Sequence, residues 1–102
     1  MPQNRDINLN NYNISKNAYR ELLYFCLQYP EKKIKTNDPC AERDCKIIEQ
    51  IAIKAAPEFY DALIKNIAFG TQYRYLNIPC GINQFYLARK KFYYFLYMAK
   101  NR

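Results

Sequence analysis

Apolar residues recur along this chain at the three- and four-residue spacing of an α-helix, whereas no alternation of apolar and polar residues runs long enough to form a strand. Two glycines and five prolines also leave too few turn residues for a β-sandwich or barrel. Half of the residues are apolar and a quarter are charged, which is typical of a folded domain. We therefore predict an all-α fold, a small bundle of about five helices.

Capping and breaking residues indicate where the helices begin and end. Ser15 is a candidate N-cap for the first helix, and Pro30 is expected to stop it. Asp38 followed by proline predicts the start of the next helix, Pro57 opens another, and Gly70 ends that one. The basic segment EKKIKTND between the first two helices is predicted to be a loop. We predict helices over residues 16–28, 39–55, 57–69 and 82–100, and one or two helical turns over 71–77.

The chain divides by composition into an arm and a domain. Residues 1–14 are polar, rich in asparagine, and predicted to form a flexible arm. Residues 15–102 are predicted to form a single helical domain, in which 15–70 supply supporting helices and 71–102 form a basic unit. The polar N-terminal segment is unlike a secretory signal, so we expect a cytoplasmic protein with reduced cysteines.

Four cysteines and the absence of histidine limit the chemistry. A zinc site would need all four thiolates, and the spacing of Cys26, Cys40, Cys45 and Cys80 matches no familiar ligand pattern. We therefore predict cysteines that pack as small apolar side chains, and no cofactor. Because histidine is absent and Ser15 is the single serine, the usual general base and nucleophile are missing, and we predict that the chain is not an enzyme. A small nuclease that uses carboxylates and a metal ion is the weaker alternative.

Charge is distributed unevenly along the chain. Residues 1–70 hold ten Lys and Arg against nine Asp and Glu, whereas residues 71–102 hold six Lys and Arg and no acid. A region of one sign predicts a polyanionic partner, which it attracts over a long range and binds by releasing counterions. A solvated basic face without a partner is the plainer interpretation. The cations of this region are Arg74, Arg89, Lys90, Lys91, Lys100 and Arg102.

The last predicted helix has distinct faces when its residues are placed at about 100° each. Apolar residues gather within roughly a third of the circle, which predicts the side that packs into the core. The opposite side combines amides, cations and tyrosines. The predicted core side holds Phe85, Ala88, Phe92, Phe95, Leu96 and Ala99, and the opposite side holds Asn83, Leu87, Lys90, Tyr94 and Tyr97.

A basic helix with amides in its first turns has the groups that a reader of the DNA major groove needs. Polar side chains near the N-terminal end of such a helix contact base edges, while cations on either side contact phosphates. The backbone N–H groups at the helix N-terminus also favour an anion. The predicted base contacts are Asn83, Gln84, Tyr86, Leu87 and Lys90, and the predicted backbone contacts are Arg74, Gly81, Ile82, Arg89 and Lys91.

Other polyanions are alternatives to duplex DNA. The run FYYFLYMA has eight residues between charges, too few to span a bilayer, and its aromatic residues surround the helix instead of gathering on one membrane-facing side. Single-stranded RNA would use tyrosines beside cations as a stacking platform, and this alternative stays open. Tyr93, Tyr94 and Tyr97 lie far along the helix and are predicted to pack on the N-terminal helices or in a dimer contact.

Two runs carry a resemblance to a known class of regulator. The chain contains Y-x-x-L-x-I-P-C-G followed by F-Y-x-x-R-K-K-F-Y-Y-x-L, which resembles the C-terminal part of the RinA and ArpU type of phage and mobile-element regulators. Their helix-turn-helix is similar to region 4 of sigma-70 family factors. The resemblance implies that Asn83 and Gln84 open a recognition helix and that Arg89, Lys90 and Lys91 meet the DNA backbone. The first helix of the motif is shorter here than in sigma region 4.

We therefore predict a C-terminal helix-turn-helix-like unit that binds double-stranded DNA. The resemblance implies a phage or mobile-element transcription regulator in a bacterial cytoplasm, with RNA polymerase as a candidate second partner and a homodimer as a candidate assembly, and without a membrane partner. The alternative is a phage-type inhibitor whose basic aromatic helix binds an acidic protein surface or a ribonucleoprotein.

Overall fold

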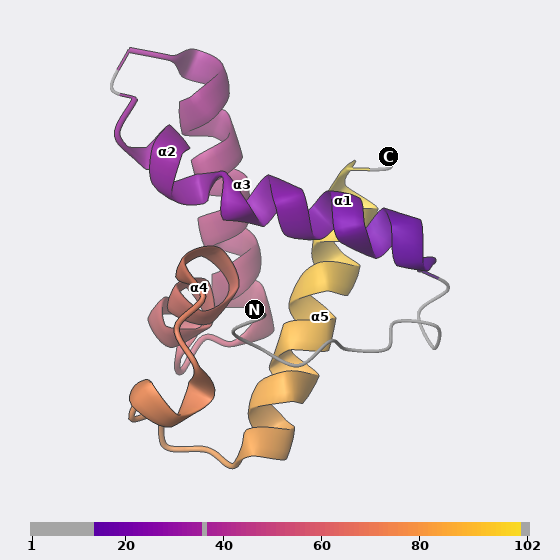
Figure 1. The fold of residues 1–102 in the computed structure, drawn as a ribbon, viewed down its shortest axis with the longest axis vertical. Helices are drawn as coiled ribbons and strands as arrows, with labels where there is room; N and C mark the ends of the chain where they lie inside the picture. Colours follow the sequence, from indigo (N-terminus) through magenta and orange to yellow (C-terminus); the bar gives the residue numbers. More distant parts are fainter. Residues whose placement is uncertain (1–13, 36, 101–102) are drawn as a thin grey trace.

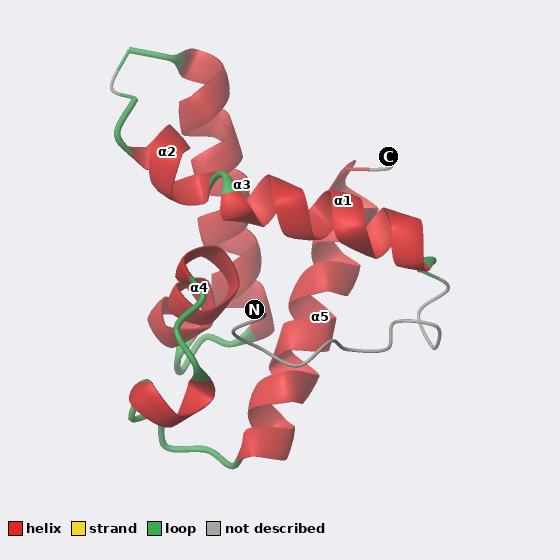
Figure 2. Cartoon of the chain, in the orientation of Figure 1, coloured by secondary structure: helices red, strands yellow, loops and turns green. Residues whose placement is uncertain are grey.

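The computed structural model describes residues 14–35 and 37–100 (Figure 1). These residues form α-helices and one 3-10 helix, and no strand occurs among them (Figure 2). The all-α prediction is confirmed. The elements are α1 (Lys16–Leu27), α2 (Tyr29–Lys33), α3 (Pro39–Ala55), α4 (Tyr60–Phe69), the 3-10 helix η2 (Tyr73–Tyr75) and α5 (Ile82–Lys100).

Two helices start at the caps that the sequence indicates. The Oγ of Ser15 accepts a hydrogen bond from the Ala18 N–H at 3.1 Å, at the start of α1. The Oδ1 of Asp38 accepts from the N–H groups of Cys40 and Ala41 at 3.0 and 3.2 Å, at the start of α3. Each side chain satisfies backbone donors that have no partner inside the helix. Both predicted starts are confirmed, and α3 has the predicted bounds.

The loop predicted between the first two long helices is partly helical. Pro30 lies in the first turn of α2, where the missing N–H of proline costs no hydrogen bond. A second, short helix therefore follows the end of α1, where the sequence predicted a loop. The last two residues of α2 then pair with α3: Lys32 Nζ lies 2.8 Å from Asp44 Oδ2, and Lys33 Nζ lies 2.7 Å from Glu49 Oε2. These pairs hold a helix of five residues that would be unstable alone.

The fourth helix begins later than predicted, at Tyr60 instead of residue 57. Residues 57–59 form a turn, in which the Phe59 N–H donates to the Ala56 carbonyl at 3.2 Å. The predicted end is confirmed, because Gly70 follows α4 with φ 73° in the left-handed region.

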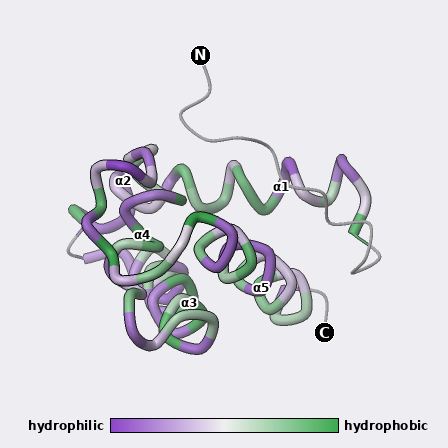
Figure 3. The backbone as a smooth tube through the Cα atoms, turned by 90° about the horizontal axis from the view of Figure 1, so that it is seen from below, coloured by the Kyte–Doolittle hydropathy of each residue, from purple (hydrophilic) through white to green (hydrophobic). Residues whose placement is uncertain are grey.

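Figures 1 and 3 show how α1 crosses the pair formed by α3 and α5. Helices α3 and α5 run side by side in opposite directions, and Figure 3 looks nearly along them while α1 lies across. Helix α5 packs against α1, α3 and α4. Because three helices contact α5, a broad section of its circumference is covered.

Buried side chains from all five α-helices form one core. The interior is aromatic around α5 and aliphatic around α3 and α4. The largest fully buried side chains are Tyr93, Phe85, Phe92, Ile48, Leu63, Leu96, Asn66 and Cys26.

The flexible arm predicted for residues 1–14 is contradicted at Ile14. Ile14 is 2 % exposed and belongs to the core, so the prediction is wrong at that position. Burial of its isoleucine side chain is favourable, so the folded domain includes Ile14 as well as Ser15. The rest of the predicted arm lies outside the described residues.

Candidate nucleic-acid interface

The connection from α4 to α5 is anchored where it leaves α4. The Thr71 N–H donates to the Lys65 carbonyl at 3.1 Å across the left-handed Gly70. Asn66, which is fully buried, donates from Nδ2 to the Thr71 carbonyl at 2.9 Å. These bonds fix the direction in which the chain leaves the helix. The role of Asn66 was not predicted, because its partner follows a turn that the sequence does not specify.

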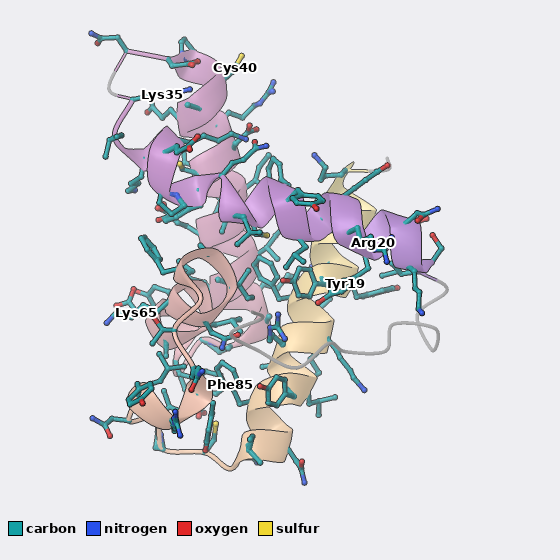
Figure 4. The ribbon with its side chains drawn as sticks, viewed as in Figure 1. Tyr19, Arg20, Lys35, Cys40, Lys65 and Phe85 are labelled. Carbon is teal, nitrogen blue, oxygen red and sulfur yellow. The ribbon has the colours of Figure 1, made fainter. Side chains whose placement is uncertain are left out.

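Tyr73 braces the other end of the connection. Its Oη donates a hydrogen bond to the Cys80 carbonyl, and its ring centre lies 5.3 Å from that of Phe85. Phe85 is fully buried and points from α5 toward η2, with the Phe59 ring centre 6.0 Å away (Figure 4). The N-terminal end of α5 is therefore held by η2 and by the turn between α3 and α4.

The connection does not have the outline of a standard helix-turn-helix. The helical turns predicted over 71–77 reduce to the single 3-10 turn of η2. Asn77 has φ 51°, which no helix tolerates, and the chain then needs residues 76–81 to reach α5. Because a helix-turn-helix joins its helices by about three or four residues, the predicted tight turn is wrong in this form. The α-helix that precedes α5 is α4.

One side of the first half of α5 faces solvent. Asn83, Gln84, Leu87 and Lys91 are exposed and fall within about 100° of the helix circumference. We call these four residues the α5 stripe. Lys90 lies beside the stripe and is half-buried.

Three more predicted contact residues lie exposed at the same end of the molecule. Gly81 and Ile82 stand at the N-terminus of α5, and a side chain added at Gly81 would meet no atom within 4 Å. Arg74 lies on η2, with its guanidinium carbon 4.9 Å from the ring centre of Tyr75. In Figure 1, η2 and the start of α5 form the end of the molecule opposite α1 and α2.

Two predicted contact residues are buried instead. Tyr86 is 8 % exposed and Arg89 is 3 % exposed, so neither side chain is available to a base or a phosphate. The Arg89 guanidinium carbon lies 5.8 Å from the ring centre of Tyr86 and 5.6 Å from that of Tyr93, in cation–π contacts. The Tyr93 ring that Arg89 contacts packs in turn on Tyr19 of α1, so α1 covers α5 around Tyr93.

The predicted core side of α5 is largely confirmed. Phe85, Ala88, Phe92 and Leu96 are buried, whereas Phe95 is half-buried and Ala99 is exposed. Lys54 of α3 places its Nζ 4.5 Å from the ring centre of Phe95, so this ring contributes to the surface between α3 and α5. Tyr93 is in the core, which agrees with the predicted packing on the N-terminal helices. Tyr94 and Tyr97 are half-buried.

The cations of this end stand apart from the ion pairs of the described residues. Lys32–Asp44 and Lys33–Glu49 join α2 to α3, and Arg43–Asp44 and Lys46–Glu42 lie within α3. One carboxylate lies close by, since burial and the charge of Glu58 raise the pKa of the Cys80 thiol. Cations of this end thus lie near one identified carboxylate, that of Glu58 at the turn before α4.

A cavity of about 460 Å³ opens beside the α5 stripe. It lies between the turn that joins α3 to α4 and the first half of α5. Its lining is mixed, with apolar residues beside the polar residues Glu58, Gln84 and Lys91. The lining residues are Ala55, Ala56, Pro57, Glu58, Phe59, Pro79, Cys80, Gln84, Leu87, Ala88 and Lys91.

The cysteines of the described residues form no metal site. Among residues 14–35 and 37–100, no three Cys, Asp or Glu side chains are grouped closely enough to hold a metal ion. Cys26 and Cys45 are buried, Cys80 is half-buried and Cys40 is exposed. None of the described helices has the length and apolar character needed to cross a membrane.

Comparison with known proteins finds no relative: no family model, no curated protein and no solved structure matches this chain. The likeness to phage regulators consequently rests on the two sequence runs alone.

Proposed function

We propose that this protein binds double-stranded DNA through the α5 stripe and the N-terminal end of α5. The observation that carries the proposal is the charge of this end. Arg74, Lys90 and Lys91 belong to a region, residues 71–102, that contains no acidic residue, and none of the three takes part in the ion pairs of the described residues. Unpaired cations clustered on one surface attract the phosphates of a duplex and release its counterions.

The α5 stripe supplies groups for both kinds of DNA contact. The amides of Asn83 and Gln84 can donate and accept at base edges in the major groove, which is wide enough for a helix. Lys91 and Lys90 lie along the helix beyond the amides, where phosphates flank the groove. The free N–H groups at Gly81 and Ile82 complete the contacts by facing a phosphate at the helix N-terminus.

The biological role follows from the resemblance. We propose that DNA binding serves transcription regulation in a phage or mobile element, in a bacterial cytoplasm, with RNA polymerase and a second copy of the chain as candidate partners. A recognition helix held by η2 and α4 replaces the standard helix-turn-helix in this proposal.

The burial of aromatic residues favours a duplex over the alternatives. A platform for single-stranded RNA needs exposed rings, and an acidic protein partner would use the aromatic side of α5. Tyr86, Phe92 and Tyr93 are buried, and the remaining aromatic side chains of that helix past Tyr93, namely Tyr94, Phe95 and Tyr97, are half-buried. The exposed amides and lysines suit a groove better than a stack of bases.

Fluorescence anisotropy with a random-sequence duplex tests the proposal. Affinity is measured at about 50 mM and about 200 mM salt, where the logarithm of the binding constant falls by about 0.9 per phosphate contact for each logarithmic unit of salt. We expect binding at low salt that weakens steeply. If the full chain does not bind the duplex at the lower salt, the proposed function is wrong.

A pair of lysine variants locates the contact. Lys91→Ala removes a cation of the α5 stripe, and Lys65→Ala removes an exposed cation on the side of α4 away from α5 (Figure 4). We expect Lys91→Ala to weaken binding to every duplex and to lower the salt slope by about one, while Lys65→Ala changes neither. Equal effects of the two variants would mean that the DNA contact lies elsewhere.

A further inference from the structure

The cavity beside the α5 stripe is open to solvent, and both apolar and polar residues line it. Ala55, Pro57 and Ala88 belong to the apolar lining, and the ring of Phe59 also lines it. The polar groups are of three kinds: the carboxylate of Glu58, the amide of Gln84 and the ammonium of Lys91. Its volume of about 460 Å³ falls within the range of sites that hold small organic ligands.

We propose that this cavity binds one unpaired base of the nucleic acid held by the α5 stripe, an inference that rests on the proposed function. A base is planar and apolar on its faces, which suits walls of alanine, proline and an aromatic ring. Its edge carries donors and acceptors, which Gln84 and Glu58 match. The phosphate attached to the same nucleotide meets Lys91.

The shared residues place a nucleotide at the mouth of the cavity. Gln84, Leu87 and Lys91 line the cavity and also belong to the α5 stripe. Nucleic acid bound along the stripe therefore runs past the opening, so an unpaired base has a short path into it. Extruding a base from an intact duplex costs stacking and pairing energy, whereas a bulged base is already free. The preferred ligand is thus a duplex with an unpaired base.

Glu58 gives the site a chemical preference among bases. A carboxylate accepts from an exocyclic amino group, which cytosine and adenine have and thymine lacks. Thymine has carbonyl oxygens at both exocyclic positions and a single ring N–H, so it offers the carboxylate fewer donors than an amino group does. We therefore expect bulged cytosine or adenine to bind more tightly than bulged thymine.

Three labelled duplexes of the same length test the proposal with the full chain. One is fully paired, one has a single bulged cytosine, and one has an abasic bulge that keeps the flexible backbone and removes the base. We expect the bulged cytosine to bind on the order of tenfold more tightly than the other two, which bind alike. Equal affinity for all three overturns the cavity proposal alone. Failure to bind any of them overturns the proposed function as well.

Two variants separate the cavity from the stripe. Ala55→Leu fills the cavity from α3 without changing the stripe, and Glu58→Ala removes an exposed carboxylate whose loss should not affect folding. We expect Ala55→Leu to abolish the preference for a bulge while affinity for the paired duplex is kept. Glu58→Ala should erase the preference for cytosine over thymine, whereas the control Glu21→Ala, on exposed α1 surface, keeps it. If Glu58→Ala keeps the full discrimination, the base does not occupy this cavity.

Discussion

The ring of Tyr93 meets the ring of Tyr19 edge-on, with ring centres 5.1 Å apart and planes at 83°. This contact joins α5 to α1, and it lies in the region of the core where Tyr93 is fully buried. Edge-to-face pairs add to the free energy that burial of the rings already provides. The pair therefore helps to hold α1 across α5, next to the contact between Tyr93 and Arg89.

Tyr93→Ala is expected to destabilise the protein by about 3 to 5 kcal/mol, because it empties an aromatic site in the core. Thermal or denaturant unfolding measures the change. Tyr24→Ala is the matched control, since Tyr24 lies on α1 with 64 % of its surface exposed and its loss should cost no more than about 0.5 kcal/mol. Similar losses in the two variants would contradict the packing of α1 on α5.

Arg89 is expected to contribute to stability and Lys91 to DNA binding, although the two residues stand only two positions apart. Arg89→Met removes a buried guanidinium that contacts Tyr86 and Tyr93, so it should lower stability by about 1 to 3 kcal/mol. The folded variant should keep its salt slope for DNA, because Arg89 does not reach a phosphate. Lys91→Met should instead leave the stability nearly unchanged and lower the salt slope. Unfolding curves and anisotropy on both variants check this, and a loss of salt slope in Arg89→Met would restore Arg89 as a DNA contact.

The features that could be predicted from sequence depend on neighbours within a few residues. Ser15 and Asp38 cap helices through bonds to N–H groups two or three residues ahead, and Gly70 ends α4 by its own conformation. The spacing of apolar residues likewise identifies most of the buried side of α5. Because these signals are local, they can be predicted before the tertiary structure is known.

The features that were missed depend on contacts between distant segments. Helix α2 is joined to α3 by ion pairs, and the Tyr93 ring that Arg89 contacts packs on Tyr19 of the distant helix α1. The brace from Tyr73 to Cys80 forms only when η2 and the start of α5 are already in place. The candidate cavity also joins residues of two separate segments, 55–59 and 79–91, which no single run of sequence brings together.

Gly70 is expected to tolerate substitution much less well than Gly81. At Gly70, φ is 73°, so Gly70→Ala forces a side chain into the left-handed region at a cost of about 1 to 2 kcal/mol. Gly81 does not share this positive φ, and an added Cβ there meets no atom within 4 Å. Gly81→Ala should therefore change stability by less than about 1 kcal/mol. Denaturant unfolding of both variants compares the two, and an equal loss would mean that the end of α4 is not held as described.

Glu49 links the stability of the α2–α3 contact to pH. Its Oε2 accepts hydrogen bonds from the Tyr29 hydroxyl at 2.5 Å and from Lys33 Nζ at 2.7 Å. Burial acts to raise the pKa of Glu49, but the hydrogen bonds from Lys33 and Tyr29 outweigh it and lower the pKa. The charged carboxylate is therefore more stable in the folded chain than in the unfolded one.

Because the folded pKa lies below the unfolded value, about 4.3 for glutamate, the stabilisation by Glu49 is fully present above that pH and is lost as pH falls through the folded pKa. Glu49→Gln removes this dependence, so wild type should be the more stable at pH 7 and the difference should shrink in acid. Denaturant unfolding at a series of pH values measures it. Glu42→Gln, which alters the exposed pair with Lys46 at 3.6 Å, is the control and should show a much smaller difference at pH 7. A difference between wild type and Glu49→Gln that stays constant down to about pH 2 would show that the carboxylate is not held by Tyr29 and Lys33.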